Sequence, residues 1–184
     1  MDECIKDGLR TMGAVSIDRI NKIKEAHRRY HEARDAYREM AAPVISDMAL
    51  LPRVYTYMSD FFRERGIGDF AATVYHRKKF LFVALWLFCP RGLAGVYTQA
   101  GMRDRLARLL GMKTKTPLSD QFVNLVFEYR TYRDFRRDVD EGLAYVTARL
   151  QADGLSGTDV SLSRVPQAGQ RQKWSAESYA APAL

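Results

Sequence analysis

The stretch MRDRLARLLGMKTKTPLSDQFVNLVFEYRTYRDFRR, residues 102–137, decides how the chain around it must be arranged. Three leucines recur in it at helical spacing: Leu106, Leu109 and Leu110. This spacing predicts a short amphipathic helix, which Gly111 should end because glycine readily takes the left-handed conformation of a helix terminus. Thr116 is expected to cap a second helix, with Pro117 at its first position, where the missing N–H of proline costs nothing. We therefore predict two helices around the basic turn KTKT, residues 113–116.

Two pairs of residues in this stretch match a DNA-binding motif. Ala107 and Gly111, four apart, resemble the small residue and turn glycine of the helix-turn-helix proteins. Leu118 and Phe122 stand where that family has buried residues of its recognition helix. The resemblance covers about residues 103–125 and implies a tri-helical unit that presents its last helix to the DNA major groove. The turn is longer than the usual three or four residues, so an ordinary helical hairpin remains an alternative.

The resemblance and the local charge suggest which side chains would contact DNA. The expected phosphate contacts are Lys113, Lys115 and Thr116. The expected base contacts are Ser119, Gln121 and Asn124. Flanking backbone contacts are expected from Arg130 and Arg133. The run Arg77, Lys78 and Lys79 is the densest basic cluster; it could contact phosphates or be a solvated flank.

Positive charge is concentrated in the middle of the chain. The formal net charge of the 184 residues is +7. Residues 66–100 carry four basic and one acidic side chain, and residues 101–137 carry nine and four. The rest of the chain is close to neutral, so this middle region predicts a surface that binds a polyanion. A basic face without a partner is the alternative.

The cysteines and the N-terminus indicate the compartment. Cys4 and Cys89 are far apart and have no neighbouring ligand residues, which favours free thiols in a reducing environment. The sequence MDECIKDGLR is acidic and polar, unlike a secretory or transit segment. The apolar run at residues 80–89 is too short to cross a bilayer. We expect a cytoplasmic protein without membrane segments.

Residues 1–42 are expected to form an N-terminal helical arm, with a helix from Ser16 to about Ala42. Apolar residues repeat along it every seven positions: Ile23, Tyr30 and Tyr37, accompanied by Ala26, Ala33 and Met40. This pattern predicts either a coiled-coil contact or a helix that lies across its own domain. His27 and His31 are four apart and could share a face, but two histidines alone do not make a metal site.

Residues 43–150 are expected to form the helical core. A helix interrupted or restarted at Pro52 should bury a broad apolar stripe between residues 48 and 62. Asp69 is expected to cap the next helix, whose second half is wholly apolar and ends at Pro90. The pattern from Pro117 to Leu150 is that of one long helix, with Arg136 at the single charged step of its apolar stripe.

Residues 151–184 are rich in Gly, Ser, Gln, Ala and Pro, which predicts a flexible tail. The chain lacks the motifs of common enzymes, such as a glycine-rich phosphate loop or His-Glu-x-x-His. We therefore expect an all-α, non-enzymatic protein without a metal, cofactor or small-molecule ligand.

The predicted function is binding of double-stranded DNA with the helix from Pro117, as a transcriptional regulator or accessory factor of a phage or mobile element. A homo-oligomer, most simply a dimer through residues 17–41 or 118–150, would supply two half-sites. The alternative is a structural or assembly protein, such as an oligomeric phage packaging or virion component, whose basic surface contacts an acidic partner.

Overall fold

The protein is all-α, as predicted, and the computed structural model describes residues 17–96 and 98–155 of it. Contacts divide the chain into two compact units, residues 1–42 and residues 43–184. The first contains α1 (Ile17–Met40). The second contains, in order, η1 (Met48–Leu50), α2 (Leu51–Glu64), η2 (Phe70–Ala72), α3 (Val74–Phe88), α4 (Pro90–Leu93), α5 (Met102–Leu109), α6 (Thr116–Thr131) and α7 (Arg133–Ala152).

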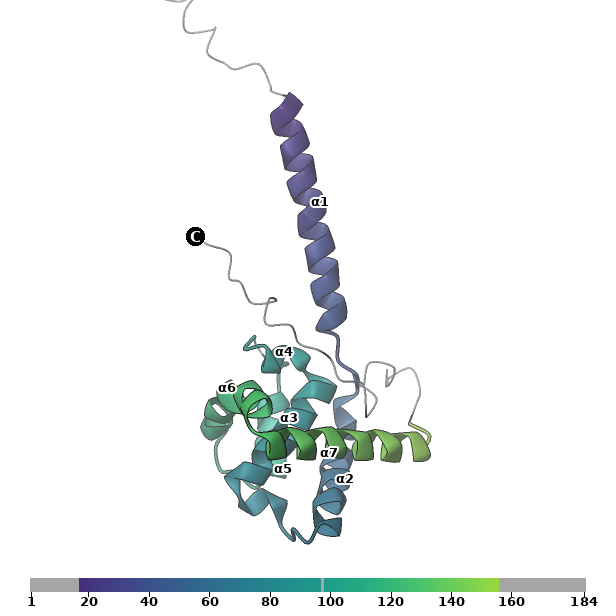
Figure 1. Ribbon diagram of the computed structural model, residues 1–184, viewed down its shortest axis with the longest axis vertical. Helices are drawn as coiled ribbons and strands as arrows, with labels where there is room; N and C mark the ends of the chain where they lie inside the picture. The colour runs from purple at the N-terminus through teal and green to yellow at the C-terminus, as the bar shows by residue number, and fades with distance from the viewer. Residues whose placement is uncertain (1–16, 97, 156–184) are drawn as a thin grey trace, which may run out of the picture. The chain divides into compact units, whose positions relative to one another are not determined.

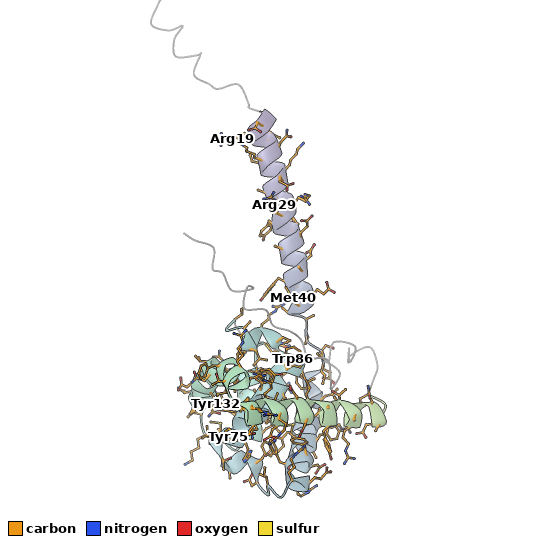
Figure 2. All side chains as sticks on the ribbon, viewed as in Figure 1. Arg19, Arg29, Met40, Tyr75, Trp86 and Tyr132 are labelled. Carbon is orange, nitrogen blue, oxygen red and sulfur yellow. The ribbon has the colours of Figure 1, made fainter. Side chains whose placement is uncertain are left out.

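Helix α1 is held by ion pairs between successive turns of its own surface. Lys22 Nζ lies 3.0 Å from Asp18 Oδ2, and Arg29 Nε lies 2.8 Å from Glu25 Oε1. Pairs at this spacing contribute modestly to the stability of a solvated helix. The side chains of α1 project on all sides of the helix (Figure 2), and most of them are exposed.

Helix α3 is the centre of the second unit. It is buried continuously from Lys79 to Leu85 and again from Leu87 to Cys89, which confirms the prediction for its apolar half. Helices α2, α4, α6 and α7 all pack against it. The predicted cap is wrong, however: Asp69 caps the short η2, and α3 begins after Thr73, whose hydroxyl accepts from His76 N.

Helices α2 and α7 pack against each other at a glycine. Figure 1 shows α7 crossing both α2 and α3, and both contacts are extensive. A Cβ on Gly142 would lie 3.1 Å from Met58 Cε and 3.2 Å from its Sδ. Gly142, the weak point of the predicted helix, therefore lies at a close approach between α7 and α2. The apolar stripe of α2 is buried as predicted, with Met58 at 0% exposure.

Helix α5 ends as the sequence predicts. Gly111 has φ +63°, in the left-handed region. The amide of Met112 donates to Ala107 O at 2.9 Å and that of Gly111 donates to Arg108 O at 3.2 Å, which is a Schellman arrangement. At the start of α6, however, Thr116 is already helical; Lys115 precedes it and no side chain caps the helix. Helix α6 packs chiefly on α3, α4 and α7.

The helix from Pro117 is not continuous to Leu150. Tyr132 has extended backbone, with φ −101° and ψ 114°, and separates α6 from α7. Arg136 accounts for this break, because its Nε donates to Tyr129 O at 2.9 Å and its Nη2 to Arg130 O at 2.6 Å. The charged step in the predicted stripe therefore satisfies the last carbonyls of α6. The Tyr129 hydroxyl also donates to Asp140 at 2.6 Å, and burial together with this bond raises the pKa of Tyr129.

Helix α7 extends through Ala152, slightly beyond the predicted end of the core. The flexible tail predicted for residues 151–184 lies almost wholly outside the described residues.

Candidate nucleic-acid interface

Helix α5 and the turn after it place five basic side chains on a short length of chain. Met102, Leu106 and Ala107 are buried, so the helical period directs Arg105 and Arg108 away from the core, whereas Arg103 lies one turn before Leu106 and Ala107 on the buried side. We call the following set the α5 basic surface: Arg103, Arg105, Arg108, Lys113 and Lys115. All are exposed except Arg103, which is half-buried.

This surface has little acidic charge to neutralise it. Asp104 is the single acidic residue between positions 103 and 115, and its Oδ1 lies 3.0 Å from Lys115 Nζ. Within the described part of the chain, Arg103, Arg105, Arg108 and Lys113 have no carboxylate at ion-pair distance.

The two exposed arginines of the α5 basic surface contact only backbone carbonyls. Arg105 Nη1 lies 3.4 Å from Met48 O, and Arg108 Nε lies 3.4 Å from Asp104 O. These are long contacts, and a guanidinium carries five N–H donors. Most donors of both groups therefore remain available to an anionic ligand.

The predicted cluster of Arg77, Lys78 and Lys79 is used inside the fold. Lys79 is buried, with 1% of its surface exposed, and its Nζ donates to Asp138 Oδ2 at 2.6 Å. Lys78 forms an ion pair with Glu128. Arg77 is half-buried, and its Nε has no partner among the described residues. The two lysines hold α3 to α7 and α6, so they do not form the phosphate contact that the sequence suggested.

The predicted base contacts on α6 face in different directions. Ser119 and Gln121 are half-buried, and the Gln121 Oε1 atom is buried without a partner in the described structure. Asn124 is exposed, but its neighbours on the outer face of α6 are the apolar Val123 and Phe127, which are 80% and 59% exposed, and the acidic Asp120, which is exposed one turn earlier. This face therefore offers one free amide for base readout.

The remaining predicted contacts divide between the two ends of α6. Lys113, Lys115 and Thr116 are exposed at its start, next to α5. Arg130 is exposed near its end, about 22 Å further along the helix at 1.5 Å per residue. Arg133 is exposed at the start of α7. One compact site cannot contain both groups, although a duplex could contact the two at separate phosphates.

An open hollow of about 620 Å³ lies where α3, α6 and α7 meet. Its lining includes Tyr75 and Tyr132, both labelled in Figure 2, together with Val74 and Arg133. The Lys78–Glu128 pair also lines it, so these two charges neutralise each other. The hollow has mixed polarity and no group of side chains arranged for proton transfer or nucleophilic attack.

Two further properties of the described residues concern metal binding and the membrane. His27 Nε2 and His31 Nε2 are 2.9 Å apart and do share a face, yet no group of three potential metal ligands occurs in this part of the chain. None of the described helices combines the length and the apolarity needed to span a bilayer.

Comparison with protein-family models, with curated proteins and with solved structures gives no match to this chain. Function must therefore be inferred from the site. Sequence reasoning missed Arg103, Arg105 and Arg108, although they lie in the most basic segment. For Arg105 and Arg108 the signal was available in the helical spacing of α5, which assigns the leucines to the core and these two arginines to the surface.

Proposed function

We propose that this chain is a non-enzymatic accessory protein that binds double-stranded DNA through the α5 basic surface. The observation that carries the proposal is the set of four cations on α5 and its turn that lack a carboxylate partner in the described structure. Elsewhere in the second unit, cations such as Arg65 and Arg137 are held in ion pairs. Charge left unneutralised on one rigid element is what a phosphate backbone attracts.

The proposed contact is to phosphates more than to bases. Arg105 and Arg108 are exposed and separated by one helical turn, and Lys113 extends the same basic segment toward the start of α6. Phosphate contacts orient a protein on a duplex without reading its sequence. Because Asn124 is flanked on the outer face of α6 by Val123, Phe127 and the acidic Asp120, it would be the main candidate for a base contact. Binding should consequently depend only weakly on sequence.

The expected salt dependence follows from the number of cations. Each neutralised phosphate contributes about −0.9 to the slope of log K against log salt. Four contacts give a slope near −3.6, so affinity should fall roughly 100-fold between 50 and 200 mM salt. Fluorescence anisotropy with a labelled random-sequence duplex measures this directly.

The test variant is Arg105→Gln/Arg108→Gln/Lys113→Gln, and its matched control is Arg53→Gln/Arg63→Gln/Arg137→Gln. Both remove three exposed positive charges, but the control removes cations that lie near carboxylates. In the test variant the magnitude of the slope of log K against log salt should fall by about 2–3, at about 0.9 per contact. The control should keep the wild-type slope. Equal losses in both variants, or binding indifferent to salt, would refute the proposal.

A second candidate is a structural or assembly role, in which the chain forms an oligomer and the basic surface contacts an acidic protein. The observation that favours it is the exposed apolar repeat of α1, because solvated helices rarely keep such a stripe without a partner. A preference for an acidic protein surface over duplex DNA in the same salt titration would support this candidate.

A further inference from the structure

Helix α1 carries an apolar seam along its own surface. The seam has two sets of positions in the heptad, first Ile23, Tyr30 and Tyr37, and second Ala26, Ala33 and Met40. Ile23 is 59%, Tyr30 63% and Met40 75% exposed. The core cluster begins at Val44. A seam repeating every seven residues along an unbroken helix is the pattern of a helix that pairs with another helix.

We propose that α1 pairs with α1 of a second copy in antiparallel orientation, centred between His31 and Glu32. The sizes of the seam residues carry this inference. In this register Tyr30 lies opposite the partner's Ala33, and Tyr37 lies opposite the partner's Ala26. Each ring thus occupies the space above a small side chain, which is how close-packed helix interfaces are filled.

The ends of the seam agree with the same register. Ile23 lies opposite the partner's Met40, so the two largest aliphatic side chains of the seam meet. A parallel pair would instead place Tyr30 against Tyr30 and Ala33 against Ala33. Crowded layers would then alternate with empty ones, and both overpacking and cavities are unfavourable.

Charge along the flanks distinguishes the two orientations as well. In the antiparallel register, the position opposite Arg29 on the partner helix is two residues from the partner's Glu32. The position opposite Lys22 is likewise two residues from the partner's Glu39. These cations now pair with Glu25 and Asp18 of their own helix. All of these groups are exposed, so exchanging partners costs little.

The parallel orientation would bring Arg29 beside the partner's Arg34 on both edges of the seam, a repulsive contact. On the second flank of the antiparallel pair, His27 approaches the partner's Arg34. Complementary size and charge thus both select a second copy in antiparallel orientation.

The first test is solution mass of the full chain at about 100 µM, with Ile23→Glu compared with Asn21→Glu. Both variants introduce the same side chain, but Asn21 lies on the face opposite the seam. The wild type and Asn21→Glu should have the mass of a dimer, and Ile23→Glu that of a monomer. A monomeric wild type, or equal effects of the two variants, would overturn the inference.

The second test fixes orientation by oxidative cross-linking in a Cys4→Ser background, since Cys89 is buried. Ala26→Cys mixed with Tyr37→Cys should form a disulfide-linked dimer, because these positions face each other only in the antiparallel register. Ala26→Cys alone should not, since its two copies would be about 16 Å apart, at 1.5 Å per residue, beyond the reach of a disulfide.

Cross-linking by Ala26→Cys alone, without the mixed product, would show a parallel pair and refute the inference. The pairing is independent of the proposed DNA binding. Neither measurement contains nucleic acid, so failure of one proposal leaves the other to be judged separately.

Discussion

The buried ion pair between Lys79 and Asp138 makes the sharpest prediction about stability. Lys79 is 1% exposed in the middle of α3, and its Nζ lies 2.6 Å from Asp138 Oδ2 on α7. The same ammonium lies 3.8 Å from the centre of the Tyr75 ring. The substitution Asp138→Leu would leave the ammonium buried with only the face of that ring as a partner.

The expected cost follows from the burial of the two partners. Removing one member of a buried ion pair costs about 3–5 kcal/mol. Because 17% of the Asp138 side chain is exposed, water can reach the vacated position, so we expect the lower limit, about 3 kcal/mol. Replacing both partners, as in Lys79→Met/Asp138→Leu, leaves neither a buried charge nor an unpaired donor. The double variant should therefore have nearly the wild-type free energy of unfolding.

Urea denaturation followed by circular dichroism measures these free energies, and thermal unfolding should show a loss of roughly 10 °C for the single variant. Asp134→Leu is the control, because Asp134 lies one turn earlier on α7 and is 75% exposed in a surface pair with Arg137. It should change stability by less than about 1 kcal/mol. The reasoning fails if Asp138→Leu is as mild as the control, or if the double variant costs the sum of the two single ones.

Three other perturbations test the framework of the core. Arg136→Ala should lower the free energy of unfolding by about 1–2 kcal/mol, because two carbonyls at the end of α6 lose a charged donor; wild-type stability in urea would show that the break needs no such support. Gly142→Ala should cost about 1 kcal/mol through the close approach of Met58. In a Met58→Ala background it should stabilise instead, because the helix propensity of alanine is then unopposed, and an unchanged sign would contradict the packing argument. Burial, then the charge of Lys79, lowers the pKa of His76 below 6.5, so the unfolded chain takes up the proton first. Stability should be complete above pH 6.5 and decline as the pH falls below it, and His76→Gln should flatten that decline.

Much of the fold is determined by local sequence. The buried stripe of α2, the apolar half of α3 and the left-handed Gly111 all follow from periodicity and backbone preference, which act within a few residues. The same reasoning failed where two local signals competed. Asp69 and Thr73 are both good caps, and only the packing of Phe70, at 1% exposure, decides that Asp69 begins a separate short helix.

The candidate site shows the same division. The sequence located the positive charge correctly in the middle of the chain, because charge is a property of composition. It could not tell which cations are neutralised, since Lys78 and Lys79 meet carboxylates 50 and 59 residues away. Those contacts exist only once α6 and α7 are packed on α3.

By itself, the sequence determined that the chain is helical and approximately where α1, α2 and α5 lie, because those properties depend on near neighbours. Tertiary structure alone decided that α6 and α7 pack separately on α3, and that Lys78 and Lys79 are neutralised whereas Arg105 and Arg108 are not. Both depend on contacts between residues far apart in the chain, such as those of Lys78 with Glu128 and of Lys79 with Asp138.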